Sequence, residues 1–131
     1  MISLTVTRDV EGHSGLIPVS IDAITFLEYE QSNNRIIVHT LEDIYYTMGT
    51  LKYWMNAIEG AGHNYVLADR NTAINVSRIV HIDTIFRVAY FENPSEANAR
   101  NCLLSIKGME RILKKANFFG TVNTHFKATF G

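Results

Sequence analysis

Short stretches in which apolar and polar residues alternate make up most of the first half of the chain. Alternation that includes β-branched or aromatic residues is typical of half-buried strands. We therefore expect strands at residues 2–7, 16–20, 23–30, 35–40 and 43–48. Pro18 limits the second strand to a sheet edge. Turn-forming residues join the third and fourth strands in a hairpin, with Asn34 and Arg35 near its tip.

The stretch from Tyr65 to Ile82 has two apolar runs around a short polar knot, Asp69-Arg70-Asn71-Thr72. This pattern predicts a core segment that lifts a few polar side chains to the surface. The knot holds a cation, a carboxylate and an amide, but no nucleophile beside a base. Its composition therefore favours recognition over catalysis.

Two helices are expected from apolar residues spaced three and four apart. The first follows Thr50, a plausible N-cap, and its apolar stripe consists of Leu51, Trp54, Met55 and Ile58. The second covers about 108–116 and carries Arg111, Lys114 and Lys115 on its outer face.

Further strands are expected at 85–92 and 102–106, and the tail from Asn117, with Phe118, Phe119 and Phe126, is expected to pack on the domain. Many short strands with two short helices predict one mostly antiparallel β domain over residues 1–131.

Composition agrees with a globular domain, since 47% of the 131 residues are hydrophobic and 19% are charged. No apolar run is long enough to span a membrane, and the N-terminus lacks a signal-peptide core. The single cysteine, Cys102, cannot form an internal disulfide. We therefore expect a cytoplasmic protein in a reducing compartment.

Charge is distributed unevenly, although the net charge is only −1. Residues 1–60 hold three basic and eight acidic residues, a balance of −5, whereas residues 61–131 hold nine basic and five acidic residues, a balance of +4. The second balance is a mild indication of an anionic partner. An uneven but ordinary solvated surface would give the same counts.

Enzyme and metal sites are not expected, and neither is a cofactor. The five histidines are scattered. His81 and Asp83 could share one strand face, but no third metal ligand has suitable spacing, so a packed strand histidine is the better interpretation. The sequence GHSG at 12–15 lacks the spacing of a nucleophile elbow. Cys102 lies in an apolar run without a paired base.

The order of these pieces resembles the LytTR DNA-binding domain, the output module of many bacterial response regulators. The pieces that carry the resemblance are ITFLEYE, RIIVHT, DIYYTMGTLKYW, YVLADRNTAINVSRIVHID and LLSIKGMERILKK. Together they cover about residues 16–116. The resemblance implies about ten short antiparallel strands in three sheets, and loops that enter the major groove of duplex DNA.

By the same resemblance, three positions are expected to contact bases: Asn34, Arg70 and Lys107. Asn34 could pair with adenine, and Arg70 with guanine. The simplest alternatives are a turn residue at Asn34, an ion pair between Arg70 and Asp69, and a solvated lysine at Lys107. Residues expected to contact the DNA backbone or to support the base contacts are Arg35, Asp69, Asn71, Arg111, Lys114 and Lys115.

Three departures from the family pattern concern DNA affinity. Asp69 stands where the family usually has His, Leu67 where it often has Arg, and Lys107 where Arg is common. A carboxylate in the knot repels phosphate, so the alternative is a protein-interaction module of the same fold that pairs with another regulator. No receiver domain is expected before the resemblance, so the chain is either a fragment or a stand-alone regulator. The DNA site expected is an imperfect direct repeat, with a second copy or another regulator as a further partner.

Overall fold

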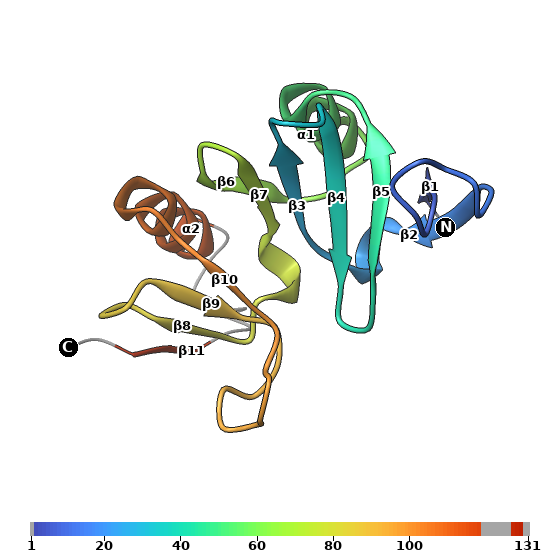
Figure 1. Ribbon diagram of the computed structural model, residues 1–131. Helices are drawn as coiled ribbons and strands as arrows, with labels where there is room; N and C mark the ends of the chain where they lie inside the picture. The colour runs from blue at the N-terminus through green and yellow to red at the C-terminus, as the bar shows by residue number, and fades with distance from the viewer. Residues whose placement is uncertain (1, 119–126, 130–131) are drawn as a thin grey trace.

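The computed structural model describes residues 2–118 and 127–129 (Figure 1). Its strands and helices follow one another in this order: β1 (Ser3–Val6), β2 (Ile17–Ser20), 3₁₀ helix η1 (Ile21–Ala23), β3 (Ile24–Glu30), β4 (Arg35–Thr40), β5 (Ile44–Met48), α1 (Leu51–Gly60), β6 (Tyr65–Asp69), β7 (Thr72–Asn75), 3₁₀ helix η2 (Val76–Arg78), β8 (His81–Asp83), β9 (Val88–Tyr90), β10 (Asn101–Leu103), α2 (Ile106–Phe118) and β11 (Lys127–Thr129).

The strands form three sheets, which confirms the expected mostly β architecture with two α-helices. β1 pairs with β2, a five-stranded sheet has the order β5-β4-β3-β7-β6, and a four-stranded sheet has the order β10-β9-β8-β11. Between named strands of the described residues, every pairing is antiparallel except that of β11 with β8. The β1-β2 pair lies at one end of the molecule, and the four-stranded sheet lies at the other end beside α2 (Figure 1).

β6 and β7 are shared between two hydrophobic cores. Alternate residues of a strand point to opposite faces of its sheet. Tyr65 and Ala73 therefore belong to the core under α1, and Val66 and Ile74 belong to the core under α2. All four residues of β7 are buried. The stretch from 65 to 82 is thus a core segment, as its apolar flanks predict, and it also joins the two cores of the domain.

A buried asparagine, Asn75, ends β7 and fixes the direction of the chain that follows. Its Nδ2 donates to the carbonyl of Ile24 over 2.8 Å, and its Oδ1 accepts from the hydroxyl of Ser77 over 2.7 Å. These bonds satisfy a side chain that is only 1% exposed, and burying an amide without partners would destabilise the fold. Asn75 therefore connects the central sheet to η2.

Helix α1 begins at the residue that the sequence predicts. Thr50 Oγ1 accepts the backbone N–H of Tyr53 over 3.1 Å, so Thr50 is the N-cap. Leu51 and Ile58 are buried in the first core, and Trp54 donates its Nε1–H to the carbonyl of Met48 over 2.7 Å. The predicted apolar stripe is therefore the core-facing side of the helix.

Three predicted elements differ from the structure by two or more residues at one end or both. The expected strand 85–92 is reduced to β9, because Asp83 Oδ1 accepts the N–H groups of Ile85 and Phe86 and forms a turn. The expected strand 102–106 ends at Leu103, and α2 begins at Ile106 rather than at about 108. The predicted packing of the phenylalanine-rich tail concerns side chains outside the described residues. None of the described helices is long and apolar enough to cross a membrane.

Candidate nucleic-acid interface

A bulge in β6 provides the foundation of the polar knot. Leu67 pairs with Ala73 and Asp69 pairs with Thr72, so Ala68 is an extra residue on its strand. Its carbonyl accepts two hydrogen bonds from Ser105, one from the backbone N–H over 2.9 Å and one from the hydroxyl over 3.1 Å. The bulge therefore binds the start of α2 directly.

Ser105 is also the N-cap of α2, which places the helix against the bulge. Its Oγ accepts the N–H of Gly108 over 2.9 Å, and its carbonyl accepts the N–H of Met109 over 2.9 Å. At Gly108 the helix comes so close to β6 that a Cβ atom would lie 1.8 Å from the Ala68 oxygen. Only glycine permits this approach, and the approach brings Lys107 beside the knot.

The knot itself is held by its own backbone. Asp69 Oδ1 accepts the N–H of Asn71 over 2.8 Å, and the carbonyl of Asn71 accepts the N–H of Tyr29 over 2.8 Å. Asp69 thus closes a turn, and among the described residues it forms no ion pair with Arg70. The Arg70 side chain is exposed, and no described side chain or carbonyl engages it.

Arg70, Lys107 and Arg111 line one groove, although 37 residues separate the first two in sequence. The groove is lined by Leu67, Asp69, Arg70, Arg87, Ser105, Ile106, Lys107 and Arg111. Arg111 Nη1 donates to the carbonyl of Leu67 over 3.3 Å. Its four cations and single carboxylate give the groove a positive balance, which favours an anionic ligand.

Arg87 is a member of this groove that the sequence analysis missed. It ends the β8–β9 turn with φ at 53°, a left-handed conformation that is uncommon for a residue with a side chain. The pattern IFRVAYFE suggested that Arg87 lies inside a strand. The signal that could have located it is Asp83, a turn-forming residue placed just before Ile85 and Phe86.

The remaining cations of α2 extend the positive surface. A second groove is lined by Met55, Tyr65, Val66, Leu67, Arg111, Lys114 and Lys115. Arg111 belongs to both grooves, so the basic face of α2 continues from the knot along the helix. Lys114 is exposed and Lys115 is half-buried.

Asn34 lies at the tip of the β3–β4 hairpin, apart from the groove. Its φ is 51°, so it occupies the left-handed turn position for which asparagine is suited. Its Oδ1 accepts the hydroxyl of Tyr29. Tyr29 therefore connects the hairpin tip to the knot, because its backbone N–H binds Asn71. A base contact at Asn34 stays a prediction.

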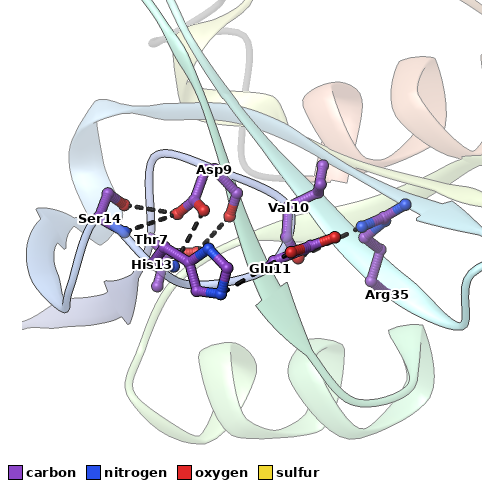
Figure 2. A network of polar contacts seen from close by, with 7 residues as sticks. All are labelled: Thr7, Asp9, Val10, Glu11, His13, Ser14 and Arg35. Atoms are coloured by element: carbon purple, nitrogen blue, oxygen red, sulfur yellow. Dashed lines mark hydrogen bonds and ion pairs between the residues drawn. The ribbon is translucent and has the colours of Figure 1, made fainter.

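Arg35 is engaged within the protein. Its Nε donates to Glu30 Oε1 over 2.7 Å, and its Nη1 donates to the carbonyl of Val10 over 3.3 Å, as Figure 2 shows for the second bond. The guanidinium also lies 5.8 Å from the ring centre of Tyr46. The hydrogen bond from Asn33, followed by that from Arg35, lowers the pKa of Glu30. Arg35 thus ties the hairpin to the β1–β2 loop, and its predicted contact with the DNA backbone stays a prediction.

That loop is shaped by Asp9 (Figure 2). The Asp9 carboxylate accepts the backbone N–H and the hydroxyl of Ser14, over 2.9 and 2.7 Å, and the N–H of His13 over 2.9 Å. These donors, the N–H of Ser14 foremost, lower the pKa of Asp9 to about 2. The sequence GHSG therefore lies in a turn closed by an aspartate.

Cys102 is buried in the core under α2. Burial raises the pKa of the Cys102 thiol to about 12, so the thiolate is disfavoured at neutral pH. No group of three or more histidine, cysteine, aspartate or glutamate residues within 2–118 and 127–129 is arranged to hold a metal ion.

Comparison with known proteins identifies a family for the chain. The family model described as "LytTr DNA-binding domain" matches residues 14–98. Among solved structures, the chain is similar to the LytTr DNA-binding domain of a protein described as a methyl-accepting/DNA response regulator from Bacillus cereus. That match has a TM-score of 0.66 and 17% identity, and it covers 88% of this chain and 97% of that one. No curated protein matches the chain.

Proposed function

The chain belongs to the LytTr DNA-binding domain family, and from this premise we propose that it is a sequence-specific transcription regulator that reads the major groove of duplex DNA with loops. The observation that carries the proposal is the juxtaposition of Arg70 and Lys107 on a braced backbone. Arg70 projects from a turn that Asp69 closes, and Lys107 projects from a helix start that Ser105 binds to the same strand.

Rigid placement is what base reading requires. The turn fixes the backbone of Arg70, and its exposed guanidinium can donate two parallel hydrogen bonds to guanine O6 and N7. The Lys107 ammonium is a single point charge, so it suits either a base acceptor or a phosphate oxygen. We assign Arg111, Lys114 and Lys115 to backbone phosphates, because charge on a helix face carries no sequence information.

We also propose the cellular location, the role and the operator that are common in this family. The protein acts in a bacterial cytoplasm as the output module of a response-regulator system, and its operator is an imperfect direct repeat occupied by two domains. The turn that the Asp69 side chain closes supports its assignment as a supporting residue, and Asn71 holds the knot to β3 through its backbone carbonyl.

One observation favours a second candidate function. The Asp69 carboxylate lines the same groove as the cations, and the first 60 residues have a balance of −5. A carboxylate beside phosphate is repelled unless it accepts a hydrogen bond from cytosine N4. The second candidate is a domain of this fold that binds another regulator and contacts DNA weakly.

Paired titrations test the proposal, with Lys114→Ala as a charge-matched control for Arg70→Ala. A cognate duplex is first selected from a random pool, and each variant is then titrated on that duplex and on a scrambled one over a salt series. We expect Arg70→Ala to cost about 1–3 kcal/mol on the cognate duplex and little on the scrambled one. Lys114→Ala should weaken both equally and reduce the log–log salt slope by about one.

The wild-type protein supplies the decisive outcome. Four to six phosphate contacts predict a log–log salt slope of about −4 to −5. Absence of binding to any duplex at low salt would contradict the proposed function and favour the second candidate. Equal weakening of both duplexes by Arg70→Ala would make Arg70 a phosphate contact and remove its base-reading role.

A further inference from the structure

The β8–β9 turn, residues 84–87, borders the groove beside the knot without being one of the three predicted contact places. Its last residue, Arg87, lines the groove together with Arg70 and Lys107. The turn is stiffened from both sides. Asp83 Oδ1 accepts the N–H groups of Ile85 and Phe86 over 2.9 and 3.1 Å, and the Arg87 carbonyl accepts the N–H of Leu104 over 2.8 Å.

Arg87 carries a charge that nothing within the described residues neutralises. The residue is half-buried, its Nε atom is buried without a hydrogen-bond partner, and it belongs to no ion pair. The Asp83 carboxylate forms no ion pair with Arg87, and its Oδ1 accepts two backbone N–H groups. A partly buried cation without an acid partner is unfavourable, and the neighbouring cations add repulsion. An anion bound in the groove would relieve both effects.

Exposed apolar side chains lie on the turn of Arg87 and on the segments next to it. Ile85 and Phe86 are 55% and 74% exposed, and Leu103 and Ile106 are 68% and 59% exposed. Ile106 lines the groove, and Leu103 pairs with Val88, the residue after Arg87. Exposed apolar groups gathered beside a positive groove fit a ligand that offers both an anion and an apolar edge.

Duplex DNA offers both, as phosphate oxygens beside deoxyribose rings along its backbone and as thymine methyl groups in its major groove. We propose that the β8–β9 turn is a further DNA contact, in which Arg87 binds a backbone phosphate next to the bases read by Arg70 and Lys107, and Phe86 packs against the adjoining sugar or methyl group. The proposal rests on the proposed function. The Arg87–phosphate contact would help to set the position of the domain along its operator.

The test removes the Arg87 charge without disturbing the turn. Asparagine adopts left-handed conformations more readily than most residues, so Arg87→Asn is compatible with a φ of 53°. Arg87→Lys keeps a cation at the same place. Arg8→Gln is the matched control, because Arg8 is an exposed arginine of the β1–β2 loop that does not line the groove. Circular dichroism and thermal unfolding establish that each variant is folded.

Fluorescence anisotropy on cognate and scrambled duplexes gives the first readout. Arg87→Asn should weaken both duplexes about 3- to 10-fold and reduce the log–log salt slope by about one, as expected for one lost phosphate contact. Arg87→Lys should recover most of the affinity, and Arg8→Gln should match the wild type. Phe86→Ser should weaken binding about 3-fold and leave the salt slope unchanged, because an apolar contact releases no counterions.

Neutral methylphosphonate linkages, placed one at a time along the cognate duplex, separate direct contact from an indirect effect. At one position, the neutral linkage should lower the affinity of the wild type and leave the affinity of Arg87→Asn unchanged. If Arg87→Asn retains wild-type affinity and slope while Arg70→Ala still weakens the cognate duplex, the inference is wrong and the proposed function stands. If every linkage affects both proteins alike, Arg87 does not touch phosphate. If the wild type binds no duplex, the proposed function fails first.

Discussion

Replacement of Gly108 by alanine tests how closely α2 must approach the bulge in β6. The added Cβ would lie 1.8 Å from the Ala68 oxygen, whereas real Cβ contacts essentially never fall below 3.0 Å. The helix or the strand must therefore move by at least about 1.2 Å. The atom in the way belongs to the backbone, so no side-chain rotation can relieve the clash.

Opposing contributions decide the sign of the stability change. Alanine favours a helix over glycine by about 1 kcal/mol. Overpacking costs about 1–3 kcal/mol, and the two hydrogen bonds from Ser105 to the Ala68 carbonyl, about 1 kcal/mol each, are stretched by the same movement. We therefore expect Gly108→Ala to lower the free energy of unfolding by about 2–4 kcal/mol.

Urea unfolding followed by circular dichroism measures this change, with Gly60→Ala as the control. Gly60 ends α1, and an added Cβ there meets nothing within 4 Å. Gly60→Ala should leave stability unchanged or raise it by up to about 1 kcal/mol. DNA affinity of folded Gly108→Ala should also fall, because Lys107 moves relative to Arg70. A Gly108→Ala protein at least as stable as the wild type would refute this reasoning about close approach.

Two further predictions concern titration and charge. Burial, which outweighs the hydrogen bond with Glu28, lowers the pKa of His39 below its ordinary value of 6.5. The unfolded chain therefore binds the proton more readily, and the free energy of unfolding should fall as pH drops below about 6.5. In urea titrations at pH 7 and pH 5, this free energy should fall less for His39→Gln than for the wild type. Equal falls would show that His39 does not cause the pH dependence. Asp69→Asn keeps an acceptor for the N–H of Asn71 but removes the charge, so it should tighten binding to cognate and scrambled duplexes alike. Unchanged affinity in anisotropy titrations would mean that the knot lies away from DNA.

The sequence carries enough information for the strands that alternate and for the segment that joins the two cores. In β6 and β7 successive residues enter different cores, so both faces of these strands are buried. This burial explains why their sequences are almost continuously apolar. The family resemblance predicts base contacts by Arg70 and by Lys107, but it does not predict that both residues line one groove. The physical cause of this proximity is the extra residue Ala68, whose carbonyl accepts two hydrogen bonds from Ser105. Neither the bulge nor these bonds can be recognised from the pattern of apolar positions.

Two parts of the candidate interface could not be predicted, for different reasons. Arg87 was hidden because a run of apolar and aromatic residues resembles a strand, whereas the side chain of Asp83 closes a turn in the middle of it. The contact of Arg35 with DNA stays a prediction, and the part that the sequence does not reveal is its hydrogen bond to the carbonyl of Val10, which is 25 residues away. Such long-range partners depend on tertiary structure alone.

Tyr29 fixes the distance between the knot and the hairpin tip. Its backbone N–H holds the knot at Asn71 and its hydroxyl holds the hairpin tip at Asn34, so one residue sets the interval between two loops. A duplex that meets both loops must present its base pairs at that interval. An operator with one base pair inserted between the two contacts would have to twist or bend to restore the spacing. The two loops cannot move apart to follow the insertion while Tyr29 binds both of them.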